Sequence, residues 1–144
     1  ANGENKTADL RLAMQKTMQL KCAVFRTDKT LEEGVNEIRK TFDGMESISV
    51  KDKSLIYNTD LVETLEFDNL LSQSIIAINS AFNREESRGA HSRQDFPKRD
   101  DKKWMKHTLT EISNDGTTDI TYRPVKLTSL TNEVKAFPPK ARVY

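Results

Sequence analysis

The stretch that most constrains the fold is residues 59–84, "TDLVETLEFDNLLSQSIIAINSAFNR". Its large apolar residues recur at helical spacing and wrap most of the circumference of the helix that they predict. A helix that is apolar nearly all round must be covered on several sides, so we expect it at the centre of its domain. Thr59 or Asp60 is the expected N-terminal cap. The apolar residues are Leu61, Leu65, Leu70, Leu71, Ile75, Ile78 and Phe82.

Three polar residues, Asp68, Ser72 and Asn79, fall on this apolar arc. Buried polar side chains in proteins nearly always have a hydrogen-bond partner. We therefore interpret each of them as bonded to a backbone or side-chain partner at a helix contact. The alternative is a catalytic role for Asp68.

Two shorter helices are predicted before this one. The first covers residues 7–23, where apolar and small side chains recur every three or four residues, and Thr7 or Asp9 is its expected cap. The second begins at "TLEE", where Thr30 and a glutamate three residues later form the pattern of a capping box. Gly44 is the expected end of this helix. The polar residues 46–58 then predict a loop.

The pattern changes after Gly89, the expected end of helical structure. From Trp104 the apolar and polar residues alternate, "SNDGTT" is typical of a hairpin turn, and "DITYRPV" predicts the return strand. The fold class predicted is mainly α: a three-helix bundle resembling a spectrin repeat, followed by a small β-hairpin and an extended C-terminal tail. We assign residues 1–88 to the helical bundle, and residues 89–144 to the basic loop, hairpin and tail of the same domain.

Composition and motifs exclude several functions. The chain has 23 basic and 22 acidic residues, a balance that disfavours a general nucleic-acid binder. Its one cysteine, Cys22, excludes an internal disulfide and a cysteine-based zinc site. His91 and His107 match no metal-binding spacing, and no glycine-rich phosphate loop is present. No apolar run approaches the roughly 20 residues of a membrane span. We predict no catalytic, cofactor-binding or metal-ligating residue.

The densest stretch is "SRGAHSRQDFPKRDDKKWMKHTL", residues 87–109. Eight basic and five acidic residues interleave between Arg84 and His107, which disfavours a groove that follows phosphates. An ion-pair network is the physical alternative, because arginine can form two parallel bonds with a carboxylate such as Glu86. We expect His91 to donate to a backbone carbonyl or an acid. The residues expected to fix this loop and to support docking are Arg88, His91, Arg93, Asp95 and Arg99.

The same stretch resembles the C-terminal signature of flavoprotein subunits of succinate dehydrogenase and fumarate reductase. Further segments resemble this family in the same order: "LRLAMQKTMQLKCAVFRTDKTLEEG", "LVETLEFDNLLSQSIIAINSAFNREESRGAH", "ITYRPV" and "FPPKARVY". Together they cover nearly the whole chain. L-aspartate oxidases share a weaker form of the pattern. Gln94 departs from it, since many members of the family carry an acidic residue there.

The resemblance implies a function for the whole subunit and a supporting role for this region. The family oxidises succinate to fumarate with FAD, and the electrons pass through an iron–sulfur subunit to quinone at the membrane. The FAD-binding and capping domains, with all catalytic residues, precede the region that this chain resembles. The chain alone is therefore expected to be inactive and to bind no cofactor itself.

The resemblance also implies partners and a location. The expected partners are the flavin-binding domain of the same chain and the iron–sulfur and membrane anchor subunits of complex II, without nucleic acid. The expected place is peripheral, on the cytoplasmic face of a bacterial inner membrane or the matrix face of the mitochondrial one. The alternatives are the C-terminal domain of a fumarate reductase or an L-aspartate oxidase, or a stand-alone helical interaction module.

Overall fold

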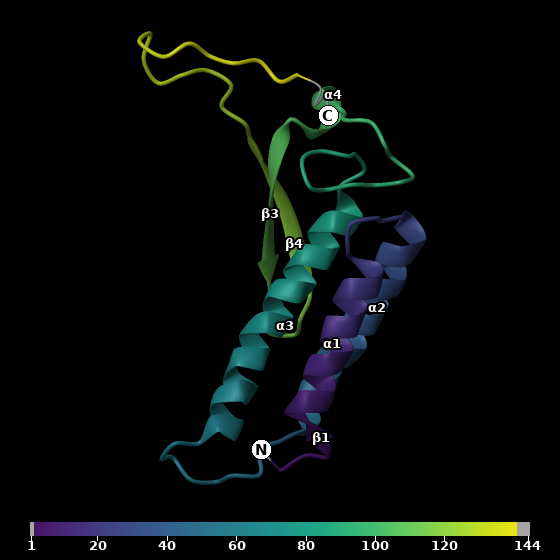
Figure 1. Cartoon of the computed structure of the whole chain (residues 1–144), viewed down its shortest axis with the longest axis vertical. Coiled ribbons are helices and arrows are strands. Elements are labelled where there is room, and N and C mark those ends of the chain that lie inside the picture. The colour runs from purple at the N-terminus through teal and green to yellow at the C-terminus, as the bar shows by residue number, and fades with distance from the viewer. Residues whose placement is uncertain (1, 141–144) are drawn as a thin grey trace.

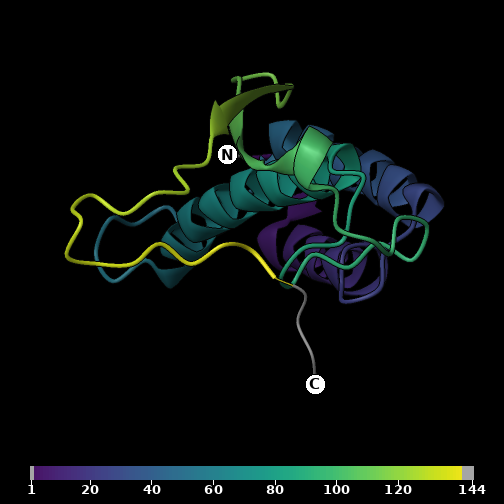
Figure 2. The ribbon, with the colours of Figure 1, turned by 90° about the horizontal axis from the view of Figure 1, so that it is seen from above.

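Three long helices lie side by side in the computed structural model, which describes residues 2–140 (Figure 1). A two-stranded antiparallel hairpin lies along the third helix, and an extended tail leaves it (Figures 1 and 2). The predicted fold class is therefore confirmed, although residues 141–144 of the expected tail lie outside the described part. The elements are α1 Thr7–Lys21, α2 Asp28–Asp43, α3 Thr59–Asn83, β3 Lys106–Ile112 and β4 Thr118–Pro124.

Short elements that the sequence did not predict close the two ends of the bundle. Strand β1, Asn5–Lys6, pairs in parallel with β2, Ile48–Ser49, next to the 3-10 helix η1, Gly44–Ser47. At the other end, the short helix α4, Asp101–Trp104, precedes the hairpin. Trp104 thus ends a helical turn and is buried, where we expected it to begin a strand.

The core lies between the three helices. Gly34 lets α2 and α3 approach closely, because a Cβ atom at this position would lie 2.6 Å from Cδ1 of Ile78. Burial of this apolar side-chain area is the main stabilising contribution, on the order of 2 kcal/mol for each large side chain. The buried apolar residues are Met14, Cys22, Leu31, Ile38, Phe67, Leu71, Ile75, Ile78 and Ala81.

Helix α3 contacts α1, α2 and the hairpin, as a central helix should. Ser80 and Thr110 share a hydrogen bond of 2.7 Å between their hydroxyl oxygens, and the Tyr122 hydroxyl donates to Asn83. The N-terminal half is different, because Val62 and Leu65 are 53% and 58% exposed. The prediction of cover on nearly all sides therefore holds only for the C-terminal half of α3.

The helix starts differ from the predicted caps. Thr27 caps α2, and its side chain and that of Thr30 bond to each other's backbone amides. The predicted capping box of Thr30 and Glu33 is wrong. Thr27, with an extended backbone, is the N-cap residue, so the helix begins one turn earlier than predicted. Asn58 caps α3 through a 2.8 Å bond from the Leu61 amide, in place of the predicted Thr59 or Asp60.

The predictions for the start of α1 and the end of α2 have different outcomes. Neither Thr7 nor Asp9 caps α1, because the N-cap residue is Lys6 and no side chain bonds to the helix start. The Thr7 hydroxyl is buried and lies 2.7 Å from the hydroxyl of Thr64. The predicted end of α2 is confirmed, since the helix ends at Asp43 with Gly44 as its C-cap. The φ of Gly44, −62°, is helical, and the chain continues directly into η1.

Candidate functional site

The charged loop, residues 84–101, connects α3 with α4 and closes one end of the bundle (Figure 1). A turn at Gly89, with φ of +58°, lets Arg88 and His91 form an isolated antiparallel bridge. A second bridge joins Arg93 to Arg26 in the turn between α1 and α2, and the Gln94 amide donates to the Arg26 carbonyl at 2.8 Å. The loop is therefore held by backbone bonds to itself and to the helical bundle.

Arg93 is the centre of this arrangement, and it is completely buried. Its Nε donates to one carboxylate oxygen of Asp95 and a terminal nitrogen donates to the other, both at 2.8 Å, which is the predicted bidentate geometry. The other terminal nitrogen donates to the Phe82 carbonyl at 3.1 Å, at the end of α3. The cation thus satisfies carbonyls that the helix end leaves without partners and interacts favourably with the helix dipole.

Asp95 extends the contact to α2. One of its oxygens accepts the Asp28 amide at 2.7 Å, so a carboxylate lies at the N-terminus of that helix, where negative charge is stabilised. The hydrogen bond from Arg93 lowers the pKa of Asp95 to about 2. The Arg93–Asp95 pair therefore ties the end of α3 to the start of α2.

Glu86 is a second buried centre, with no exposed surface. Arg88 forms a two-pronged contact with it at 2.8 and 3.1 Å, Arg84 donates at 3.1 Å, and the Asp100 amide donates at 2.9 Å. Burial alone would raise the pKa of Glu86, but the bonds from Arg88 and the Asp100 amide hold it below the ordinary value. The carboxylate joins both ends of the charged loop.

His91 lies between two fixed partners. Its Nε2 is 2.9 Å from the Arg84 carbonyl, and its Nδ1 is 2.8 Å from a guanidinium nitrogen of Arg26. A carbonyl only accepts and a guanidinium only donates, so the ring is neutral with its proton on Nε2. Burial lowers the pKa of His91, and the cations of Arg26, Arg93 and Arg84 lower it further.

Arg99 lies at the edge of this arrangement. Its Nε is 3.0 Å from Asp101, and a terminal nitrogen donates to the Lys140 carbonyl at 3.1 Å, which connects the loop to the tail. Of the five residues predicted to fix the loop, Arg88 and His91 are partly buried and Arg93 is completely buried, while Asp95 pairs with Arg93 from an exposed position. Sequence reasoning missed two partners from outside the loop, Arg26 and Asp28, and the bonds of Arg84 within the loop and to the hairpin.

Arg84 also fixes the start of the hairpin. It donates to the Trp104 carbonyl at 2.7 Å and to the Lys106 carbonyl, and its guanidinium carbon lies 5.3 Å from the Trp104 ring centre. The arginine is partly buried, so this stacking adds to the hydrogen bonds. The loop network and the hairpin are therefore one continuous structure.

The arrangement is suited to fixing a backbone. The cations and carboxylates of its interior bond to one another or to the backbone, and the described residues contain no group of side chains that could hold a metal ion.

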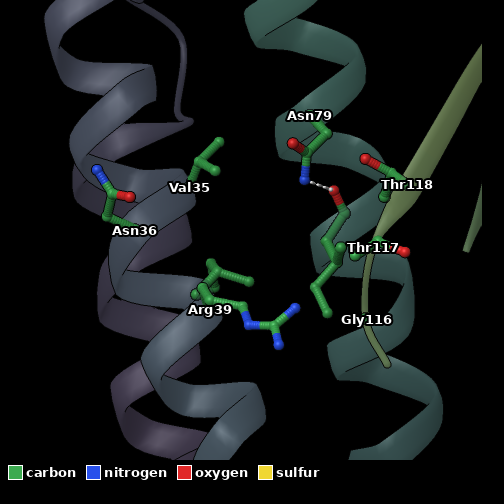
Figure 3. A pocket seen from close by; sticks show the side chains of 9 residues that line it. Val35, Asn36, Arg39, Asn79, Gly116, Thr117 and Thr118 are labelled. Carbon is green, nitrogen blue, oxygen red and sulfur yellow. Dashed lines mark hydrogen bonds between the residues drawn. The ribbon is translucent and has the colours of Figure 1, made fainter. Parts of the chain in front are cut away.

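A pocket of about 250 Å³ lies between α2, α3 and the hairpin turn (Figure 3). Arg39 reaches into it but pairs with Asp43 at 2.9 Å and donates to the Asp115 carbonyl. Asn79 donates to the Ile75 carbonyl at 2.9 Å, which confirms the bonded role expected for it. Asp68, in contrast, is exposed, so it is not one of the buried polar residues expected on this arc.

Comparison with known proteins shows the family of this chain. A family model described as "Fumarate reductase flavoprotein C-term" matches residues 11–144. The chain belongs to this flavoprotein family. It is 54% identical to a succinate dehydrogenase flavoprotein subunit of Rickettsia felis and 51% identical to the mitochondrial one of Oryza sativa, over 144 residues. A fumarate reductase flavoprotein subunit of Mycobacterium tuberculosis is 37% identical.

The family's solved structures have the same fold. An E. coli quinol fumarate reductase superposes on 90% of the chain with a TM-score of 0.85 and 32% identity. The chain covers 23% of that protein and 24% of the Rickettsia felis subunit, about a quarter of either. Among residues 2–140, no helix combines the length and apolar character that a membrane crossing requires.

Proposed function

We propose that this chain is the C-terminal docking domain of a succinate dehydrogenase flavoprotein subunit. In the whole subunit, succinate is oxidised to fumarate by FAD that the preceding domain binds. Electrons then leave to an iron–sulfur subunit and quinone. The domain contributes no catalytic residue. Its charged loop supports docking to the flavin-binding part or to an adjacent subunit.

One observation carries this proposal: the irregular charged loop is bonded around two buried charged residues, Arg93 and Glu86. A loop of this kind costs conformational entropy to fix, and buried charges cost desolvation. Such costs are expected where the shape of the loop matters to a partner. The 54% identity to a succinate dehydrogenase flavoprotein subunit supports succinate as the substrate of the whole subunit. The proposed place is a membrane surface, reached through partner subunits.

Two alternatives keep the docking role. In a fumarate reductase the same domain would belong to a subunit with the opposite direction of electron flow. The E. coli quinol fumarate reductase, 32% identical to this chain, supports this alternative through its shared fold. In an L-aspartate oxidase the substrate would differ. A stand-alone interaction module is the third alternative, and it predicts no flavin in the natural protein.

The test compares the natural full-length protein with the chain of residues 1–144. Flavin absorbance and succinate-driven dye reduction are measured for both. We expect a yellow, active long chain and a colourless, inert short one. A natural protein without flavin would contradict the proposal, and dye reduction with L-aspartate but not succinate would favour the oxidase.

A further inference from the structure

Three consecutive large apolar residues project from the end of the bundle opposite the charged loop. Leu55, Ile56 and Tyr57 are 88%, 76% and 97% exposed. We call residues 55–57 the apolar loop tip. Single exposed apolar residues are ordinary, but three in a row that face water are a mark of an interaction surface.

The apolar loop tip is held in place by its neighbours. The buried side chain of Asn58 donates to the carbonyls of Asp52 and Ser54 at 2.9 and 2.8 Å, and accepts the Leu61 amide. Asp52 in turn accepts the Ser54 amide at 2.8 Å. The loop that carries the tip is therefore shaped by specific bonds before any partner arrives, which lowers the entropic cost of binding.

Tyr57 adds a local strain. Among the described residues it alone, glycines aside, has a positive φ, of 51°. An aromatic residue in the left-handed region costs on the order of 1 kcal/mol or more, and such strain is concentrated at functional sites. The strained backbone turns Tyr57 outward, where it contributes nothing to the core of this chain.

The surroundings of the tip continue the surface. Val62 and Leu65, on the first turns of α3, are more than half exposed. A hollow of about 280 Å³, lined in part by Val50, Leu55 and Leu61, opens beside the tip. The loop tip and the hollow together offer both a projection and a recess to a complementary apolar surface.

The place of the tip indicates which partner meets it. The Gly3 amide donates to the Ile48 carbonyl at 3.1 Å, and β1 pairs with β2 just before the loop (Figure 1). The start of the described chain therefore lies at the same end as the tip. The matching family model is the C-terminal one, and the chain spans only 24% of its Rickettsia felis relative. Most of such a polypeptide precedes this region and reaches it at this end.

We propose that the apolar loop tip is the docking element for the flavin-binding part of its own polypeptide, an inference that rests on the proposed function. Covalent connection at this end gives the preceding part a high effective concentration at the tip, which no separate subunit has. Cover by that part also accounts for the apolar half of α3 that this chain leaves exposed.

The test places a photoreactive benzophenone amino acid at position 57 of the flavin-loaded, full-length subunit within its complex. After irradiation, we expect cross-linked peptides that join position 57 to the polypeptide preceding residue 2. A cross-link to another subunit or to a second copy would overturn the proposal, and so would an absence of cross-links. The matched control carries the same group in place of Glu32, an exposed residue on α2.

A second readout keeps the two proposals separate. Succinate-driven dye reduction of the unmodified complex tests the proposed function alone. If the complex is active while position 57 cross-links elsewhere, only the docking inference fails. In addition, amide exchange at residues 54–58 should be at least tenfold slower in the full-length subunit than in the chain of residues 1–144. Equal rates would contradict the inference.

Discussion

The two ends of the helical bundle differ in which residues they bury and which they expose. At one end, Arg93 and Glu86 are charged and have no exposed surface. At the other end, Leu55, Ile56 and Tyr57 are apolar and nearly fully exposed. Charged residues are rarely buried unless paired, and apolar residues are rarely exposed in groups, so both ends require an explanation.

The difference teaches what each end is for. The charged loop satisfies its polar groups within the chain, so its contribution to stability should be measurable in this chain alone. The side chains of the apolar loop tip are mostly exposed in this chain, so their contribution should appear mainly with a partner. Mutations at the two ends should therefore separate stability from assembly.

The largest expected effect is at Arg93. Replacement by Met keeps the side-chain volume but leaves Asp95 and the carbonyls at the end of α3 without their cation. Because Asp95 keeps the Asp28 amide and some exposure to water, we expect a loss near the lower limit for broken buried pairs, about 3 kcal/mol. Urea unfolding followed by circular dichroism measures it. Gln94→Ala, with an exposed side chain, is the control and should change little.

Glu86 is expected to come second. Glu86→Gln removes the charge that Arg84 and Arg88 share, yet preserves the shape, so we expect a loss of about 2 kcal/mol. The neighbouring Glu85 offers a matched control, since its pair with Lys103 is exposed and Glu85→Gln should cost less than about 1 kcal/mol. Equal losses in the two variants would show that burial of the pair is not what matters.

Much of this structure was predictable, and the exceptions have physical reasons. The apolar periodicity predicted α3 and its core face, and the alternation with a glycine turn predicted the hairpin. The box at Thr30 was placed one turn late, because Thr27 and Thr30 are both threonines and only the backbone decides between them. Arg88, Arg93 and Asp95 were expected in the charged loop from their spacing.

The partners Arg26 and Asp28 were not predictable from the loop itself, because they come from a distant turn that only the tertiary fold brings close. The apolar loop tip was missed for a different reason. Residues 46–58 are polar on average, and three apolar residues within them carry no periodicity. Their exposure is a property of the fold and has no signature in the sequence.

The pH dependence of stability tests His91. Its pKa is lowered in the folded chain, so below the ordinary pKa of about 6.5 the unfolded chain binds the proton first. The contribution of neutral His91 to the free energy of unfolding should therefore be fully present above that pH. It should decrease as the pH drops to 5. Asp95 adds a second fall between about pH 4 and pH 2, from its folded pKa of about 2.

His91→Gln identifies the first of these two falls. Its amide can still donate to the Arg84 carbonyl but cannot take up a proton, so we expect a loss of about 1 kcal/mol at pH 7. The decrease between pH 7 and pH 5 should become smaller in this variant. Urea unfolding at the two pH values measures both quantities. His107→Gln, at an exposed position on β3, is the control and should leave that decrease unchanged.

The smallest expected effect is at the apolar loop tip, and it completes the contrast between the two ends. Ile56→Ser removes an apolar side chain that is 76% exposed, so the free energy of unfolding of this chain should change by no more than about 0.5 kcal/mol. In the full-length subunit the same substitution should lower the stability of the domain contact, seen as faster amide exchange at residues 54–58. If Ile56→Ser destabilised the chain of residues 1–144 by as much as Arg93→Met does, the tip would be part of its core. The two ends would then not divide stability from assembly.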